Sequence, residues 1–335
     1  MEGNTATIRD VAKQAGVSAS TVSRILNYDD TLSVSDETRR TVLEIVEKLQ
    51  YKKKVKKNSS SNDKIAIIQW HSSKEEMNDL YYLQIQYGIE NKALGMGIAV
   101  STLSFSDLIS VHMSRYNGII AIGKFDDAEI TELASFNLPL VFIGQNYLPY
   151  GYDSVQSDFI SPISWIIRHF IENDIDKIGM IAGQEQTGTK HNTVYDPRAI
   201  TFKKELSNLN IFNPDFMFEG SYGPDSGFKL MEQAINKLDK NLPSGFIIGS
   251  DSMAIGALKA LKQHSINVPK RVSLISFNDV SIAKYADPSL STIHVYTEIM
   301  GERAFNLLIE RIHNSKKIPE SIIIGSKFIK RESSI

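Results

Sequence analysis

The sequence contains no cysteine, which excludes disulfide bonds, cysteine nucleophiles and cysteine-ligated metals. It also lacks an apolar run of the roughly 18 residues that a membrane-spanning helix needs. The first ten residues, MEGNTATIRD, have neither the basic nor the apolar region of a secretion signal. We therefore expect a protein that stays in the cytoplasm and makes no contact with a membrane.

Motifs of common enzyme classes are missing as well. The sequence has no Gly-x-Ser-x-Gly turn, no phosphate-binding P-loop and no His-Glu-x-x-His pair. Its seven histidines are scattered without the spacing of metal ligands. Gly95-Met-Gly97 lacks the third glycine of a dinucleotide-binding loop. We therefore expect no enzyme: no catalytic residue, no metal and no cofactor.

A strong basic excess is also missing, since the net charge is −2. The charge is unevenly distributed, however. Residues 1–64 hold 12 Lys and Arg against 9 Asp and Glu, which leaves 25 against 30 for the rest of the chain. A mildly basic head on an acidic body is compatible with a DNA-binding module attached to a different kind of domain.

Residues 7–27, TIRDVAKQAGVSASTVSRILN, predict two short helices joined by a tight turn. Thr7 can cap the first helix. Gly16 stands where that helix must end, because glycine adopts a left-handed backbone without steric cost. Ser18 then caps the second helix. An amphipathic helical hairpin of this kind also occurs in ordinary protein cores, so the pattern alone leaves that alternative open.

The second helix has two different faces. Val22, Ile25 and Leu26 form the face that should be buried. The opposite face consists of small or hydrogen-bonding residues, which can enter a DNA major groove: Ala19, Ser20, Thr21, Ser23 and Arg24. A third helix, capped by Ser35, carries a stripe that should close a three-helix core: Thr38, Val42, Ile45, Val46 and Leu49.

A lysine-rich segment follows the third helix. Residues 52–57 read KKKVKK and are followed by NSSSND. Beside a DNA-binding unit these lysines could neutralise phosphates, although most such runs are simply solvated surface. We divide the chain into a headpiece at residues 1–57, a linker at 58–64 and a body at 65–330.

The body alternates strand and helix patterns, which implies parallel sheets. Strands are predicted at Ile65–Gln69, Ile98–Thr102, Gly118–Ile122, Leu138–Ile143, Lys177–Ala182, Gly245–Ile248 and Val272–Phe277. Helices are predicted at Asp79–Met96, Val155–Ile171, Pro197–Leu206, Asp225–Leu238, Asp251–Lys262 and Thr297–His313. Two such series of about 120 residues predict two similar lobes. Ligands of open α/β sheets bind beyond the carboxyl ends of the strands, so the expected site is a cleft between the lobes.

The N-terminal residues resemble the headpiece of the LacI/GalR family of bacterial repressors. The matching residues are Ile8, Asp10, Val11, Ala12, Ala15-Gly16-Val17-Ser18, Thr21-Val22-Ser23-Arg24, Asn27, Val34-Ser35, Thr38-Arg39 and Leu49-Gln50-Tyr51. The body resembles the same family over essentially all of 65–330. Its matches include Tyr82, Gly88-Ile89-Glu90, Asn117-Gly118-Ile119-Ile120, Asp158, Arg198, Ser250-Asp251-Ser252-Met253-Ala254, Phe277-Asn278-Asp279 and Pro288.

This resemblance implies an α/β fold: a small all-α helix-turn-helix headpiece plus a two-lobed, periplasmic-binding-protein-like body with parallel sheets. It implies a homodimer that binds double-stranded operator DNA and a small sugar. The segment LYYLQIQYGIE looks most like galactose-operon repressors of lactic-acid-type bacteria, which makes galactose or a galactoside the first guess. The chain departs from the family at the linker, which lacks the Ala-rich hinge helix with its leucine, and at Thr201 and Asn278, where many members have glycine and aspartate.

The candidate site residues follow from the helix faces and from this resemblance. Ala19, Ser20 and Arg24 should face base edges. The other predicted DNA contacts are Thr7, Ser18, Thr21, Ser23, Asn27 and Tyr51. For the sugar, whose hydroxyls need fixed hydrogen-bonding groups and whose C–H faces stack on aromatic rings, the candidates are Trp70, Tyr82, Arg198, Ser250 and Asn278.

The function expected from these features is a transcriptional repressor of a sugar-utilisation operon whose operator affinity is altered by a sugar. One alternative is a global catabolite-type regulator that is controlled by a protein partner. A solute-binding protein of a transport system is a further alternative, but it would need a secretion signal and no DNA-binding head.

Overall fold

The computed structural model describes residues 8–26, 34–35, 38, 41–42, 45–46, 64–70, 80–187, 193–315 and 317–335. The chain divides into two compact units, Met1–Ser60 and Ser61–Ile335. The predicted boundaries of headpiece, linker and body at residues 57 and 64 stay predictions, because residues 47–63 lie outside the described part. The five lysines of residues 52–57 and Leu49 lie outside it as well.

The first unit contains the two predicted short helices, α1 (Ile8–Ala15) and α2 (Ala19–Leu26). Gly16 between them has a left-handed backbone, with φ at +67°. The amide of Val17 donates to the carbonyl of Ala12 at 3.1 Å, which satisfies one of the last carbonyls of α1. Residues 38, 41–42 and 45–46 are helical, and Ser35 Oγ accepts from the amide of Thr38 at 3.2 Å, as a capping serine does. The small core consists of Val11, Ala12, Val22, Ile25 and Val42.

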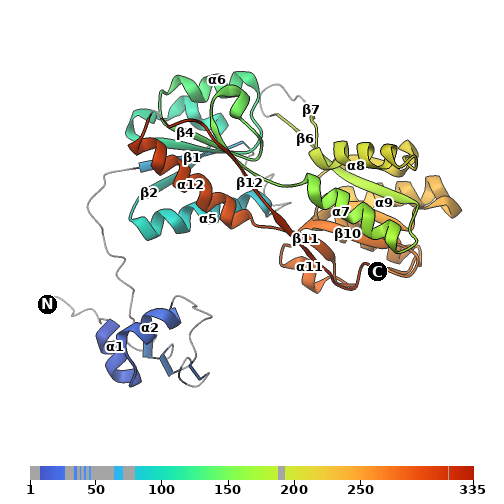
Figure 1. The fold of residues 1–335 in the computed structure, drawn as a ribbon, viewed down its shortest axis with the longest axis horizontal. Helices are drawn as coiled ribbons and strands as arrows, with labels where there is room; N and C mark the ends of the chain where they lie inside the picture. Colours follow the sequence, from blue (N-terminus) through green and yellow to red (C-terminus); the bar gives the residue numbers. More distant parts are fainter. Residues whose placement is uncertain are drawn as a thin grey trace. The chain divides into compact units, whose positions relative to one another are not determined.

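The second unit consists of two lobes, each built on one sheet (Figure 1). Lobe 1 has six parallel strands in the order β12-β5-β4-β3-β1-β2. Their bounds are β1 Lys64–Gln69, β2 Ala99–Ser104, β3 Gly118–Ile122, β4 Leu140–Ile143, β5 Asp153–Ser157 and β12 Ser321–Ile324. The lobe also contains α5 (Tyr81–Met96), α6 (Asp127–Ser135), α12 (Thr297–His313) and the 3-10 turns η1 (Phe105–Ser110), η2 (Met113–Arg115) and η3 (Leu148–Tyr150).

Alternating residues of the lobe 1 strands pack on its two faces. Ile65 and Ile67 belong to one core with α5 and α12, whereas Ala66 and Ile68 belong to the other with α6. Both faces of the strands are thus covered, which explains why β1 and β3 are continuous apolar runs.

Lobe 2 has seven strands, with β13-β11-β10-β9-β6-β7 in sequence across the sheet and β8 paired to β6. Their bounds are β6 Ile178–Gln186, β7 Thr193–Val194, β8 Met217–Ser221, β9 Gly245–Ile248, β10 Ser273–Asn278, β11 Ser291–Val295 and β13 Ser326–Ile329. The helices are α7 (Ile160–Glu172), α8 (Pro197–Asn208), α9 (Pro224–Leu238), α10 (Asp251–Gln263) and α11 (Ile282–Tyr285), with 3-10 turns η4 (Pro214–Phe216) and η5 (Asp239–Asn241). Helices α7 and α8 pack on one face, and α9 and α10 on the other.

The prediction of two consecutive series was wrong in one respect, because the C-terminal helix α12 packs on lobe 1. Its residues Met300, Ala304 and Phe305 share a core with Ile65 and Ile67. The chain therefore crosses between the lobes three times: after β5, after β11 and between β12 and β13. The lobe 2 sheet is also not wholly parallel, since β7 and β13 run antiparallel to β6 and β11.

A second correction concerns the start of α7. Val155–Ser157, predicted as the beginning of a helix, lies in β5. The helix begins at Ile160 and not at Asp158, but the Asp158 side chain accepts from the amides of Ile160 and Ser161 at 2.9 and 3.0 Å.

Candidate functional site

The predicted DNA-contacting residues that the structure describes lie on α2 or directly before it. Ser20 is exposed and Arg24 is half-buried, and they share a face because they are four residues apart on a helix. Ser18 is an N-cap whose Oγ accepts from the amide of Thr21 at 3.0 Å and lies 2.9 Å from the hydroxyl of Thr21. Ala19 is half-buried against the small core.

Four other predicted DNA contacts are not described. Thr7, Asn27 and Tyr51 lie outside the described residues, and the side chain of Ser23 does as well. The DNA contacts as a set therefore stay predictions.

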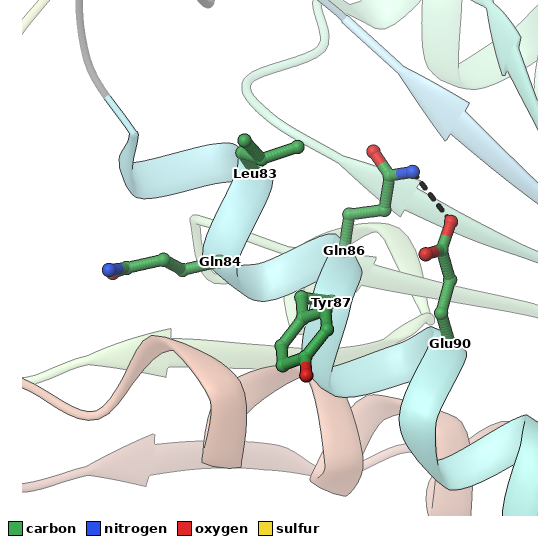
Figure 2. A pocket seen from close by; sticks show the side chains of 5 residues that line it. All are labelled: Leu83, Gln84, Gln86, Tyr87 and Glu90. Atoms are coloured by element: carbon green, nitrogen blue, oxygen red, sulfur yellow. Dashed lines mark hydrogen bonds between the residues drawn. The ribbon is translucent and has the colours of Figure 1, made fainter. Parts of the chain in front are cut away.

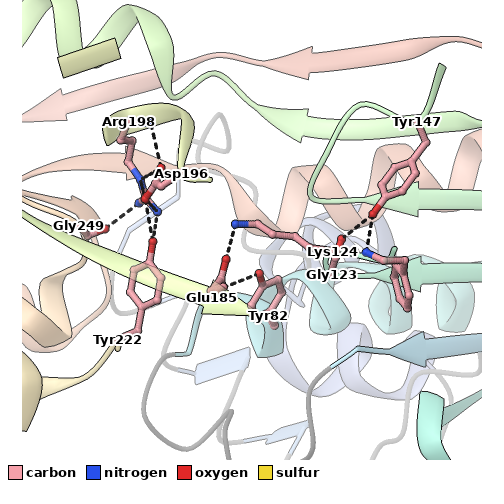
Figure 3. A network of polar contacts seen from close by, with 10 residues as sticks. Tyr82, Gly123, Lys124, Tyr147, Glu185, Asp196, Arg198, Tyr222 and Gly249 are labelled. Carbon is pink, nitrogen blue, oxygen red and sulfur yellow. Dashed lines mark hydrogen bonds and ion pairs between the residues drawn. The ribbon is translucent and has the colours of Figure 1, made fainter. Parts of the chain in front are cut away.

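Charged and hydroxyl groups from the two lobes meet where the strands of both sheets end (Figure 3). Lys124 follows β3 in lobe 1, and Glu185 lies near the end of β6 in lobe 2. The Lys124 ammonium pairs with Glu185 Oε2, and both side chains are 12% exposed. Tyr82, on α5 of lobe 1, donates its hydroxyl proton to Glu185 Oε1 at 3.0 Å. A single carboxylate of lobe 2 is thus bound by two groups of lobe 1.

Arg198 forms a second network within lobe 2. Asp196 caps α8 by accepting from the Arg198 amide at 2.9 Å, and its carboxylate also accepts from the Arg198 guanidinium at 2.9 Å. The guanidinium donates to the carbonyl of Gly249 at 2.7 Å and to the hydroxyl of Tyr222, which in turn donates to Asp196 at 3.0 Å. Its central carbon lies 4.6 Å from the centre of the Phe159 ring, in cation–π contact.

We call these six residues the inter-lobe cluster: Tyr82, Lys124, Glu185, Asp196, Arg198 and Tyr222. Burial raises the pKa of Asp196, but the charge and hydrogen bonds of Arg198, together with the charge of Lys124, outweigh burial and lower that pKa. Burial would likewise lower the pKa of Arg198, but Asp196 raises it. Burial and the Glu185 charge together raise the pKa of Tyr82 well above its ordinary value. Burial raises the pKa of Tyr222 as well. Tyr82 and Tyr222 therefore act as neutral hydroxyl groups.

The remaining predicted effector residues lie around this cluster. Trp70 is buried and makes an edge-on contact with the Tyr82 ring at 6.4 Å between ring centres. Ser250 directly follows Gly249, but it is fully buried and its Oγ caps α10 by accepting from the Met253 amide at 3.3 Å. Asn278 ends β10 beside Phe277, is buried, and has a positive φ of 106°. Ligand binding by Trp70, Tyr82, Arg198, Ser250 and Asn278 stays a prediction.

Sequence reasoning missed four members of the cluster: Lys124, Glu185, Asp196 and Tyr222. Asp196 could have been found, because Asp-Pro before an amphipathic pattern is a helix-start signal and its carboxylate then lies beside the first turn. The pairing of Lys124 with Glu185 has no local signal, since it joins side chains 61 positions apart from different lobes.

Over the described ranges, no group of three or more His, Asp or Glu side chains is arranged to hold a metal ion. Within the same part of the chain, no helix is long and apolar enough to span a membrane.

Comparisons with known proteins agree with the fold. The sequence profile described as "Bacterial regulatory proteins, lacI family" matches residues 7–54, and a periplasmic binding protein-like domain matches residues 167–334. The protein named HTH-type transcriptional regulator GalR of Lacticaseibacillus casei is 46% identical over 98% of this chain and 99% of its own length. A protein of the same name from Streptococcus thermophilus is 37% identical over 98% of this chain and 99% of its own length.

Solved structures show the same architecture. A transcriptional regulator CelR–cellobiose complex aligns with a TM-score of 0.72 at 21% identity, covering 98% of this chain and all of that one. A lac repressor dimer bound to operator and the anti-inducer ONPF aligns with a TM-score of 0.70 at 20% identity, covering 99% of this chain and all of that one. With its helix-turn-helix headpiece and two-lobed body, this chain belongs to the lacI family of bacterial regulatory proteins and is a DNA-binding transcriptional regulator, not an enzyme.

Proposed function

We propose that the chain is a cytoplasmic repressor of a sugar-utilisation operon, and that a small sugar bound between its lobes alters its affinity for operator DNA. Galactose or a galactoside is the first candidate. One observation carries the proposal: Glu185 of lobe 2 is bound by Tyr82 and Lys124 of lobe 1. A ligand that contacts groups of both lobes binds with different affinity when the lobes are arranged differently. A regulatory ligand must have such a difference in affinity.

The chemistry of the inter-lobe cluster suits a polyol. Hydroxyl groups donate to carboxylates and accept from ammonium, guanidinium and phenol groups, all of which occur there. Trp70 and Tyr82 supply aromatic rings for the C–H faces of a sugar. The resemblance to proteins named GalR supports the same ligand class.

We also propose that a second copy of the chain packs on α5. Figure 2 shows a shallow pocket on this helix, lined by Leu83, Gln84, Gln86, Tyr87 and Glu90. Leu83 and Tyr87 are 47% and 54% exposed and lie one helical turn apart, so they form an exposed apolar patch on one face of α5. A homodimer would place two headpieces on the two halves of a pseudo-palindromic operator.

The DNA contacts proposed for α2 remain those of its exposed face. Ala19, Ser20 and Arg24 contact base edges, and Ser18, Thr21 and Ser23 lie nearer the phosphates. Thr7, Asn27 and Tyr51 complete the set.

Selection of bound sequences from a random DNA pool, repeated with and without galactose, lactose and glucose, tests this proposal. Enrichment of a pseudo-palindrome that weakens or disappears with one sugar is the expected result. Enrichment that no sugar changes, but that a cell extract protein does change, would instead support the catabolite-type regulator controlled by a protein partner.

A further inference from the structure

We infer that Glu185 sets the charge selectivity of the inter-lobe site, so that the site accepts uncharged polyhydroxylated ligands and rejects their phosphorylated forms. The inference rests on the proposed function, because it assumes that a sugar binds between the lobes. Beyond that function, it specifies that the ligand is uncharged and that Glu185 selects for an uncharged ligand.

The first support is the arrangement of charges. Lys124 pairs with Glu185, and Arg198 pairs with Asp196, so each cation of the inter-lobe cluster already has a carboxylate within ion-pair distance. The side chains of the Lys124–Glu185 pair are 12% exposed and those of the Arg198–Asp196 pair 8% and 5%. Charges this well shielded from water interact strongly with any further charge placed beside them.

The second support is that the two ion pairs influence each other. The Glu185 charge contributes to the raised pKa of Arg198, and the Lys124 charge contributes to the lowered pKa of Asp196. An anionic ligand placed beside one ion pair would therefore also interact with the carboxylate of the other pair. It could bind Lys124 only by competing with Glu185 for the ammonium, which would leave the carboxylate buried and poorly compensated.

The third support comes from the neutral members of the cluster. Tyr82 donates its proton to Glu185 at 3.0 Å, and Tyr222 donates to Asp196 at 3.0 Å. Both hydroxyl groups stay protonated because burial raises their pKa. Sugar hydroxyls can take part in such hydroxyl–carboxylate contacts without adding charge.

Glu185→Gln tests the inference, because it removes the charge with almost no change in shape and leaves Lys124 without its carboxylate. The full-length chain is titrated calorimetrically with galactose, lactose, glucose, and the 6-phosphates of galactose and glucose. For the wild type we expect an uncharged sugar to bind at least about 100-fold more tightly than its 6-phosphate. For Glu185→Gln we expect the ratio of the affinity for the uncharged sugar to the affinity for its 6-phosphate to fall at least tenfold.

Two further variants control for indirect effects. Lys124→Met/Glu185→Gln removes both charges of the pair and should restore preference for the uncharged sugar, although both affinities fall. Glu219→Gln removes a more exposed carboxylate of lobe 2, whose side chain is 36% exposed beside Lys203 at 3.8 Å, and should leave the ratio unchanged. Each variant must melt within a few degrees of the wild type, which shows that it folds.

The outcomes separate this inference from the proposed function. If the wild type binds an uncharged sugar and Glu185→Gln keeps the wild-type ratio, the inference is wrong and the proposed function stands. If the wild type binds a 6-phosphate as tightly as the uncharged sugar, the inference is again wrong while sugar control stands. If the wild type binds none of the five compounds, the proposed function fails, and the inference fails with it.

Discussion

Arg24 and Arg198 carry the same guanidinium group in opposite environments. Arg24 is half-buried on the outer face of α2, whereas Arg198 is 6% exposed and bound to Asp196, Tyr222 and the carbonyl of Gly249. We propose that the first contacts a DNA base. The second organises lobe 2, so that replacing it alone would leave Asp196 buried without its cation, which typically costs about 3–5 kcal/mol of stability.

Arg24→Ala should weaken binding to the operator by about 1–3 kcal/mol if the guanidinium forks onto a guanine. Arg24→Lys keeps the charge but not the paired donors, so it should retain non-specific binding and still lose discrimination at one base pair. Fluorescence anisotropy with the operator and with single-base variants measures both effects. Equal operator affinity for the wild type and Arg24→Ala would remove Arg24 from the DNA-contacting set.

Asp251 is a fully buried carboxylate at the start of α10. It accepts from Ser276 Oγ at 2.5 Å, Thr292 Oγ1 at 2.7 Å and the amide of Val280 at 2.8 Å. Burial raises its pKa to about 7, although these hydrogen bonds oppose the shift. The folded state therefore holds a proton between pH 3.8 and about 7 that the unfolded state has released, so this group's contribution to stability decreases as pH rises through that window.

Asp251→Asn cannot titrate and should lose this pH dependence. As pH falls from 8 to 5, the wild type should gain stability relative to the variant. Below pH 7 the gain in unfolding free energy should be up to about 1.4 kcal/mol per pH unit. Urea unfolding at four pH values measures it. A difference that is constant with pH would show that Asp251 is ionised throughout the range.

At the scale of elements, α5 and α12 approach each other closely because each has a glycine at the contact. A Cβ atom on Gly88 would lie 2.2 Å from the carbonyl oxygen of Glu298, and one on Gly301 would lie 2.2 Å from that of Ile85. Helices α9 and α10 of lobe 2 use the same arrangement, since a Cβ on Gly227 would lie 2.0 Å from the Met253 oxygen. Each lobe thus contains one helix pair in backbone contact.

Gly88→Ala should destabilise the body by about 1–3 kcal/mol, because a methyl group would force the α5 and α12 backbones apart. Gly95→Ala on the same helix is the matched control. A Cβ there meets nothing within 4 Å, so alanine should be neutral or stabilising by up to about 1 kcal/mol. Thermal unfolding of the two variants makes the comparison, and equal midpoints would contradict the proposed close packing.

Element prediction from the sequence succeeded where a pattern was long or continuously apolar. Gly118–Ile122, Gly245–Ile248 and Thr297–His313 have the predicted bounds. Among the described strands, β5, β7, β8, β11, β12 and β13 were not predicted. Strands such as β5, Asp153-Ser-Val-Gln-Ser157, mix polar and apolar residues, whereas β12 is apolar but only four residues long. Periodicity also showed that α12 is amphipathic without showing which sheet it covers, since both lobes offer an apolar face.

The candidate site was predictable only in part, for the same reason. Ligands of open α/β sheets bind beyond the carboxyl ends of the strands, and Trp70 and Asn278 do lie at the carboxyl ends of β1 and β10. The contact of Glu185 with Tyr82 and Lys124 depends on how two separately folded lobes face each other, and no local pattern encodes that.

On the scale of the whole molecule, dimerisation should depend on the exposed face of α5. Leu83→Asp/Tyr87→Asp introduces charges into this face and should convert the dimer to a monomer at micromolar concentration, because buried unpaired charges are costly. Ile171→Asp, at an apolar residue of α7 that is 40% exposed, is the control and should remain dimeric. Light scattering during size-exclusion chromatography measures the mass. A double variant that stays dimeric would place the interface elsewhere.

We propose that one ligand, bound between the lobes, changes the affinity of the headpiece for DNA. The most direct measurement is the operator dissociation constant of the full-length wild type across a galactose series, paired with the galactose dissociation constant with and without operator. We predict a saturable change in operator affinity of at least fivefold, and the same factor in galactose affinity, because coupling between two binding sites is reciprocal. Galactose that binds with equal affinity to the free and the operator-bound protein would contradict the account.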